Sequence, residues 1–184
     1  FSLNTSAQNN FGTGATNYTP TGTQIVNNYY TISMVTPSVS NVILSLANGV
    51  PSASMPAVND LVLLIVMDDL TGEVGKFTFG NVSAILGSTC TVTPKYLPIS
   101  SPQNSFSFLS STNILKMQLI VVPQYGDLNL CSGQLTATEY DEANGTGGIL
   151  SFFVKGTLTY ATNSINLDGK GFPGRPELLT GTVP

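Results

Sequence analysis

The sequence predicts an all-β fold in a single domain, either a jelly-roll-like β-sandwich or a β-solenoid-like structure, with an extended strand-forming N-terminal arm. No window of about 11 to 18 residues shows the i, i+3, i+4, i+7 spacing of an amphipathic helix. Short apolar stretches separated by Gly, Asn and Pro run through the chain instead. Between Gly148 and Gly169 the pattern suits solenoid rungs and antiparallel sandwich strands equally, so periodicity does not choose between them.

The N-terminal third carries no charge, because no Asp, Glu, Lys or Arg precedes Asp60. A solvent-exposed stretch normally carries charge, so we expect another subunit to cover part of this one; a flexible neutral leader is the alternative. Residues 24–35 alternate and predict a half-buried strand. Four of its apolar side chains share one face and are the candidate donor-strand residues for assembly: Val26, Tyr30, Ile32 and Met34.

The apolar pattern divides the chain into a charge-free arm (residues 1–35), an all-β core (36–175) and a short tail (176–184). Residues 60–67 are continuously apolar after Asp60, which predicts a strand buried on both faces. Residues 76–86 and 89–93 flank Gly87 and predict a hairpin, and residues 94–111 predict a long irregular loop. Further strands are expected at residues 38–47, 113–122, 127–130, 134–138, 148–154, 156–160 and 164–167.

Charge and hydropathy exclude two classes of partner. The 184 residues carry a net charge of −4, and the six basic side chains are scattered, whereas nucleic-acid binding needs them clustered. The longest apolar run, residues 61–67, is far shorter than the roughly 20 residues of a transmembrane helix, so no transmembrane segment is expected. The first residue is Phe1, which fits a mature chain after signal-peptide removal and predicts an extracellular or cell-surface location.

The residue types available argue against an enzyme. There is no histidine, which removes the usual general base and metal ligand, and no nucleotide-binding or nucleophile motif occurs. The remaining chemistry is that of carboxylates, which could cleave polysaccharides, bind a structural Ca²⁺ or simply form polar turns. The turn interpretation fits their sequence context best, and no other cofactor is expected. The candidate Ca²⁺ ligands are Asp68, Asp69, Asp141 and Glu142.

Two cysteines and four tyrosines are further candidates. Cys90 and Cys131 lie in strand-like segments outside any metal-binding pattern, so they form either a disulfide or two free thiols. Exposed aromatic rings would suit a carbohydrate-binding surface, although strand tyrosines more often pack in a core. The candidates are Tyr29, Tyr30, Tyr125 and Tyr140.

An ordered series of short motifs runs from Asn59 to Gly174: NDLVLLIVMDD, GKFTFGNVSAI, LIVVPQYGDLNL, GQLTA, GTGGILSFFVKGTLT and INLDGKGFPG. In order and spacing it resembles a β-rich module of bacterial secreted and cell-surface proteins that ends in a Gly-Lys-Gly-Phe-(Arg/Pro)-Gly motif. The resemblance implies an adhesin-like or appendage-associated chain, and it brings no catalytic residues. The expected Gly-Phe-Arg-Gly-Gly close here has Pro173 after Phe172.

These observations predict an extracellular structural subunit of a bacterial surface filament or fibre. Copies would polymerise head to tail, with residues 24–35 donated as a strand to an open sheet edge of the neighbour. The alternative is an adhesin-type module that recognises glycans or another surface, with this strand paired within its own chain. A β-helical carbohydrate-active enzyme using Asp68 or Asp141 is the weakest hypothesis.

Overall fold

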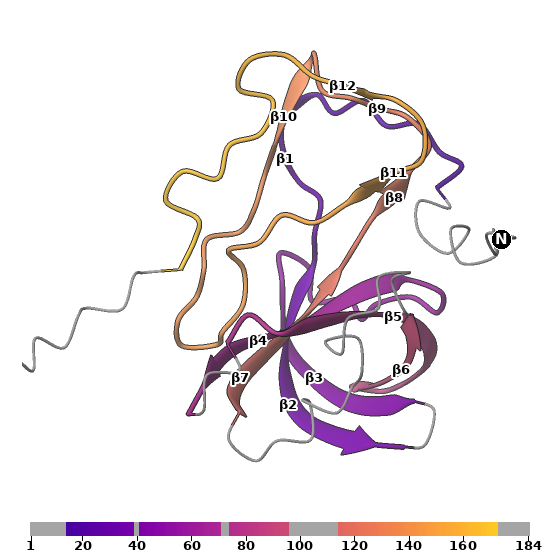
Figure 1. The fold of residues 1–184 in the computed structure, drawn as a ribbon, viewed down its shortest axis with the longest axis vertical. Helices are drawn as coiled ribbons and strands as arrows, with labels where there is room; N and C mark the ends of the chain where they lie inside the picture. The colour runs from indigo at the N-terminus through magenta and orange to yellow at the C-terminus, as the bar shows by residue number, and fades with distance from the viewer. Residues whose placement is uncertain (1–13, 39–40, 71–73, 96–113, 173–184) are drawn as a thin grey trace, which may run out of the picture.

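The computed structural model describes residues 14–38, 41–70, 74–95 and 114–172, and within them the chain is all-β without a helix. This confirms the prediction that the fold is all-β. The described strands form two regions, a barrel and, beside it, a set of short parallel strands (Figure 1). The predicted tail, the first 13 residues of the predicted arm and most of the predicted loop at 94–111 lie outside the described residues.

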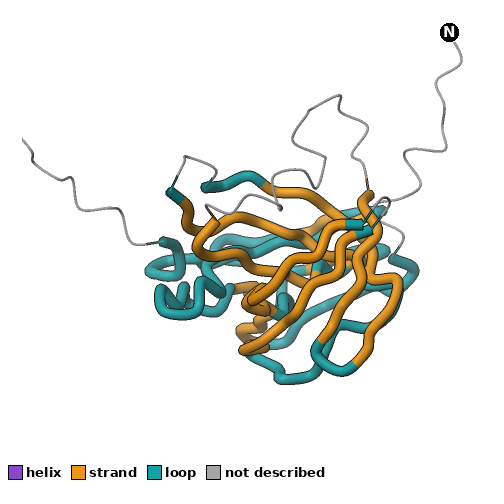
Figure 2. The backbone as a smooth tube through the Cα atoms, turned by 90° about the horizontal axis from the view of Figure 1, so that it is seen from below, coloured by secondary structure: helices purple, strands orange, loops and turns teal. Residues whose placement is uncertain are grey.

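The barrel is closed by six strands in the order β2-β3-β6-β5-β4-β7, and every neighbouring pair is antiparallel. Its wall curves around on itself, as the tube view shows (Figure 2). A closed barrel pairs the edges of all its strands, so it leaves no open ladder. The strands are β2 (Tyr29–Pro37), β3 (Val42–Val50), β4 (Leu61–Asp69), β5 (Phe77–Leu86), β6 (Thr89–Lys95) and β7 (Ile114–Val121).

Strand β4 is buried along almost its whole length, as its unbroken apolar run predicted. Alternate side chains such as Val62 and Leu64 point into the barrel, while Leu61 and Leu63 pack on its outer wall. The predicted hairpin is also confirmed, because β5 and β6 pair from Leu86 and Thr89 outward. The interior cluster comprises Tyr30, Ile32, Val42, Leu44, Leu46, Val62, Leu64, Val66, Val82, Cys90, Val92, Met117 and Leu119.

The second region, which we call the parallel stack, consists of a first segment (14–26), a middle segment (124–137) and a last segment (150–167). All its strand pairs are parallel, and the middle segment lies between the other two. The first segment pairs with it through β1 (Gly22–Ile25) and β10 (Gly133–Thr136). The last segment pairs through β11 (Phe153–Val154) with β8 (Gln124–Tyr125), and through β12 (Leu158–Thr159) with β9 (Leu128–Asn129).

The barrel is thus an insertion of residues 27–123 between the first and middle segments. Inside the stack, Leu128, Leu130 and Leu135 are 0 to 1% exposed. A third apolar cluster joins the two regions, where the outer wall of β4, β5 and β7 packs against residues of the last segment. One of its contacts is the edge-on approach of Phe79 to Phe153, with ring centroids 5.6 Å apart.

Polar contacts also join the two regions. The buried Asn27 side chain donates to the carbonyl oxygens of Val121 (2.8 Å) and Ser151 (2.7 Å), and its own oxygen accepts from the Ser151 N–H (3.0 Å). The buried Gln118 amide makes a similar reciprocal pair with the backbone of Gly147. Each buried amide is therefore satisfied at the junction, which orients the stack on the barrel.

Candidate functional site

The last segment of the stack exposes side chains that occupy core positions. Leu158 pairs in register with the fully buried Leu128, and Ile165 with the fully buried Leu135. Yet Leu158 is 41% exposed and Ile165 is 46% exposed. Tyr160, which aligns with the buried Leu130, is 70% exposed. These apolar side chains are exposed because no fourth layer covers them within the part of the chain that the structure describes.

The backbone of the last segment also faces outward at these positions. The N–H groups of Leu128 and Leu130 donate to the carbonyl oxygens of Thr157 (2.9 Å) and Thr159 (2.7 Å). Backbone groups alternate in direction along a strand, so the N–H and C=O of Leu158 point away from the middle segment. The N–H and C=O of Ile165 point away from the middle segment too, because its neighbours Ser164 and Asn166 bond to the backbone of Leu135. The last segment therefore presents an open parallel edge.

The first segment presents the opposite edge. Tyr18 donates its N–H to the Asp127 carbonyl and accepts from the Asn129 N–H, both at 2.9 Å. Because backbone groups alternate in direction along a strand, the carbonyl of Asn17 and the N–H of Thr19 point away from the middle segment. Natural edge strands usually carry charges that block pairing with other chains. Neither residues 14–26 nor residues 156–167 contain a charged side chain.

One corner of the stack repeats a polar contact from layer to layer. The Asn17 side-chain oxygen accepts from the Asp127 N–H at 2.8 Å, and the Asp127 side chain accepts from the Thr157 N–H at 2.7 Å. Gly156 is required beside this ladder, because a Cβ there would lie 2.2 Å from the Asp127 carboxylate oxygen. The ladder satisfies one backbone donor in the middle layer and one in the last layer, and it ends at Thr157.

The structure places the predicted donor-strand residues in three different environments. Tyr30 and Ile32 lie in the chain's own barrel core, Val26 is half-buried against the core of the stack, and Met34 is 57% exposed. Two irregularities in the β2–β3 pairing, the second between Ile32 and Met34, break the predicted alternation. Strand β2 also crosses the boundary predicted at residue 35, because it continues to Pro37 and pairs with both β3 and β7.

The two cysteines are separate thiols in the structure. Cys90 is buried in the barrel interior and Cys131 is exposed on the middle segment. Burial, together with the nearby Asp60 carboxylate, raises the pKa of the Cys90 thiol to about 11, because both disfavour the thiolate. The sequence left either a disulfide or two free thiols open, and in the structure both thiols are free.

The predicted Ca²⁺ ligands do not form a joint site. No group of three or more His, Cys, Asp or Glu side chains that could hold a metal ion is found among the described residues, which include all four ligands. The Asp141 carboxylate instead accepts from the N–H groups of Ala143 (2.9 Å) and Asn144 (3.3 Å) and from the Asn144 side chain (2.6 Å). These hydrogen bonds lower the pKa of Asp141 and match the turn interpretation.

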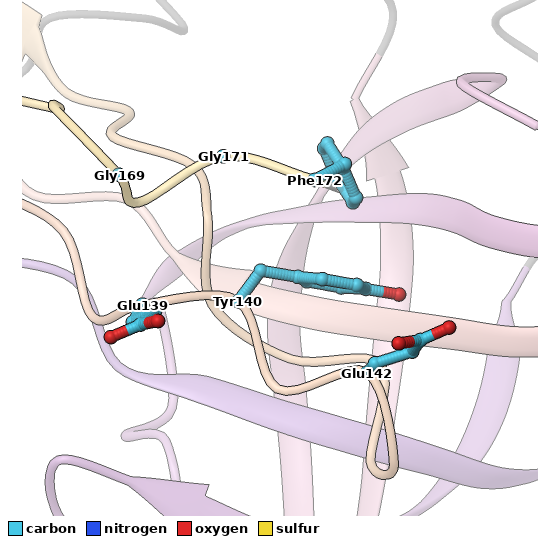
Figure 3. A pocket seen from close by; sticks show the side chains of 6 residues that line it. All are labelled: Glu139, Tyr140, Glu142, Gly169, Gly171 and Phe172. Carbon is cyan, nitrogen blue, oxygen red and sulfur yellow. The ribbon is translucent and has the colours of Figure 1, made fainter. Parts of the chain in front are cut away.

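A shallow cavity of about 540 Å³ lies where the loop after β10 meets the Gly-Lys-Gly-Phe motif (Figure 3). The rings of Tyr140 and Phe172 lie with centroids 4.5 Å apart, and the Tyr140 N–H donates to the Lys170 carbonyl. Burial is the main cause of the raised pKa of the Tyr140 hydroxyl, and the carboxylates of Asp68, Glu142 and Asp141 add to it. The lining residues are Glu139, Tyr140, Glu142, Gly169, Gly171 and Phe172.

Of the four candidate tyrosines, Tyr140 is the one that lines this cavity. Tyr29 and Tyr30 are core residues whose hydroxyls donate to the carbonyl oxygens of Ile149 (2.6 Å) and Ser54 (2.5 Å). Tyr125 stacks on Tyr18 with ring centroids 5.1 Å apart. This stacking links the first and middle segments, so these three tyrosines pack within the fold.

The open edges were not predicted from the sequence, although one signal for them was present. Residues 156–160 and 164–167 were predicted as strands, and their charge-free pattern is also that of an unprotected edge. Comparison with known protein-family models, curated proteins and solved structures finds no match to this chain. No helix that could cross a membrane occurs in the described ranges.

Proposed function

We propose that this chain is an extracellular structural subunit of a bacterial surface filament or fibre, in which copies join head to tail by addition of β-strands. The observation that carries the proposal is the exposure of the core positions Leu158, Tyr160 and Ile165 on a charge-free edge. An exposed apolar patch beside outward-facing backbone groups favours association with another β-edge. The bacterial surface and the filament come from the resemblance of residues 59–174 to adhesin-like modules.

The geometry favours addition at the stack over release of residues 24–35. Strand β2 pairs with β3 and β7, and Tyr30 and Ile32 fill the barrel, so donating it would open the barrel and expose its core. Adding a layer to the stack requires no such rearrangement. We therefore place the assembly contact on the stack, which has the arrangement of a short β-solenoid.

A capped solenoid covers its end layers with polar residues, whereas an assembling one leaves them apolar. Residues 14–26 and 156–167 of the two exposed segments carry no charge, and the last segment has apolar residues at its core positions. A contact between two different edges is heterologous, so it propagates into an open polymer unless the rotation closes a ring. This is the property required of a filament subunit.

The proposal is tested with a charged residue placed on the edge. Leu158→Lys should prevent polymer formation in negative-stain electron microscopy and light scattering, because each added layer would bury the ammonium group. Leu86→Lys is the matched control, since Leu86 is 83% exposed at the β5–β6 hairpin of the barrel. Polymers of normal length from Leu158→Lys, or a parent chain that stays monomeric under all conditions tested, would reject the proposal.

The alternative, an adhesin-type module, is supported by the cavity beside Tyr140. An aromatic ring flanked by carboxylates can stack on a sugar face and accept hydrogen bonds from its hydroxyl groups. Binding on a glycan array that is lost in Tyr140→Ala and retained in Tyr160→Ala would favour this function. Tyr160 is a suitable control because it is an exposed tyrosine outside the cavity.

A further inference from the structure

We infer that the cavity beside Tyr140 and Phe172 binds a sugar that carries a free amino group, as in the glucosamine units of a deacetylated polysaccharide. The inference rests on the adhesin-type alternative above, whose ligand it narrows, and it does not depend on assembly through the stack. The cavity volume of about 540 Å³ lies within the range of about 300 to 1,000 Å³ that small-molecule sites occupy. A shallow surface site of this kind would recognise one unit of a longer glycan.

Two aromatic rings form the apolar side of the cavity. The ring centroids of Tyr140 and Phe172 lie 4.5 Å apart, the rings are inclined by 54°, and Phe172 is 48% exposed. An aromatic face provides an apolar surface for the C–H groups of a sugar ring, and its negative quadrupole attracts a cation within about 6 Å of the centroid. An amino sugar presents a C–H face and an ammonium group on the same ring, so it can use both interactions.

The charged side chains that line the cavity are both acidic. Glu139 and Glu142 lie on either side of Tyr140 (Figure 3), and no basic side chain lines the cavity among the described residues. A protonated amine adds a Coulomb attraction to the hydrogen bond that it donates to a carboxylate, whereas a hydroxyl or an acetylated amine brings no charge of its own. An acidic sugar would be repelled, so the charge of the lining favours an amino sugar.

The wider surroundings of Tyr140 carry the same sign of charge. The carboxylates of Asp68, Glu142 and Asp141 add to burial in raising the pKa of the Tyr140 hydroxyl, because they disfavour a negative charge there. The same carboxylates favour a positive charge at this point. Lys116 offsets part of their charge, since it pairs in register with Asp68 and its ammonium group donates to the Glu142 carbonyl. Three acids beside one base leave an excess of negative charge.

The loop that carries both glutamates is held in place by backbone hydrogen bonds. The Asp141 N–H donates to the Thr146 carbonyl (2.8 Å), and the Asp141 carbonyl accepts from the Gly145 N–H (2.7 Å). The Tyr140 N–H donates to the Lys170 carbonyl (3.1 Å), which holds the loop against the Gly-Lys-Gly-Phe motif. The cavity is therefore formed without a ligand, and a pre-formed site lowers the entropy that binding would cost.

The test compares two glycans that differ only in acetylation of the amino group, a glucosamine tetramer and the matching N-acetylglucosamine tetramer. In calorimetric titration of the full chain, the glucosamine tetramer should bind about tenfold more tightly, and added NaCl should reduce this preference because salt screens exposed charges. Glu139→Gln/Glu142→Gln should make the two affinities equal. Glu139→Asp/Glu142→Asp is the matched control, since it keeps both charges and should keep the preference. Both positions are exposed, so neither variant disturbs the core.

The outcomes separate this inference from the proposed functions. A preference for the glucosamine tetramer that requires Tyr140 and the two glutamates supports the inference. Equal binding of both tetramers that is lost in Tyr140→Ala overturns the assignment of the amino group and leaves the adhesin-type function in place. Binding of neither tetramer overturns the inference, while the filament function is decided separately by the polymer assay on Leu158→Lys.

Two further outcomes would also overturn the inference. A preference that survives both Glu139→Gln/Glu142→Gln and Tyr140→Ala would reflect the net charge of −4 of the whole chain, and the cavity would not be the site. Tighter binding of a lysine tetrapeptide than of the glucosamine tetramer would identify a basic peptide, and not a sugar, as the occupant of the cavity.

Discussion

The barrel and the parallel stack use the same kinds of side chain but end in different ways. In the barrel each of the six strands has a partner on both sides, and its interior side chains are at most 8% exposed. In the stack the core positions of the middle segment (Leu128, Leu130 and Leu135) are equally buried, while the equivalent positions of the last segment are 41 to 70% exposed. Closure, more than composition, therefore decides whether a β-region of this chain is self-sufficient.

The largest effect should come from a charge in the closed region. Ile32→Asp places a carboxylate in the barrel core and should cost more than about 4 kcal/mol of the free energy of unfolding, measured by urea denaturation. Met34→Asp, two residues along the same strand but 57% exposed, should change it by less than about 0.5 kcal/mol. A folded, stable Ile32→Asp variant would show that β2 is dispensable in the barrel and would restore residues 24–35 as the donor strand.

The stack itself provides the sharpest comparison of open and closed layers. Leu128→Ala should destabilise the monomer by about 2 to 5 kcal/mol, because it leaves a cavity in a fully buried position. Leu158→Ala, in the same column but 41% exposed, should cost less than about 1 kcal/mol in dilute solution. Equal losses in urea denaturation at low concentration would mean that the last segment is already covered in the monomer.

The junction between the regions should show an intermediate effect. Asn27→Ala removes three hydrogen bonds and leaves the buried backbone groups of Val121 and Ser151 without this partner. The expected loss is about 2 kcal/mol, since each unsatisfied buried group costs about 1 to 3 kcal/mol. Gln24→Ala, which removes one exposed local bond to Thr21, is the control. If Asn27→Ala splits the urea transition in two, the barrel and stack unfold separately; an unchanged midpoint would contradict the assigned role of Asn27.

The sequence was sufficient for the all-β class and for elements with strong local signals. The apolar run of β4 and the turn at Gly87 depend on neighbours in the chain, so they could be predicted. The parallel pairing of Tyr18 with Leu128 joins residues that the whole barrel separates, and local periodicity carries no information about it. The irregularity before Met34 arises from the pairing of β2 with β3. The predicted alternation of side chains along that strand therefore breaks there.

The candidate site was less predictable, for a related reason. The exposure of Leu158 depends on the number of layers stacked above it, whereas its residue type is that of an ordinary core position. Composition therefore suggested burial, and the topology was needed to show an open edge. For Asp68, Asp69, Asp141 and Glu142, the sequence left calcium and turns open, and the hydrogen bonds of Asp141 match the turn.

The smallest expected effect concerns the buried thiol of the barrel. The pKa of Cys90 is raised to about 11 in the folded chain, against about 8.5 for an unfolded cysteine. The unfolded chain therefore loses its proton first, so this contribution is fully present below about pH 8.5 and is lost as the pH rises towards 11. Between pH 8.5 and 9.5, where tyrosines remain protonated in the unfolded chain, the parent should lose up to about 1 kcal/mol more stability than Cys90→Ala.

The matched variant for this measurement is Cys131→Ala, because Cys131 is the exposed thiol of the stack. It should keep the full pH dependence of the parent in urea denaturation, because this variant retains the buried Cys90 thiol. The same difference should appear in thiol labelling, where Cys131 reacts in the native protein and Cys90 reacts only on unfolding. Rapid labelling of both thiols would show that the barrel opens readily, and the contrast between a closed barrel and an open stack would then lose its basis.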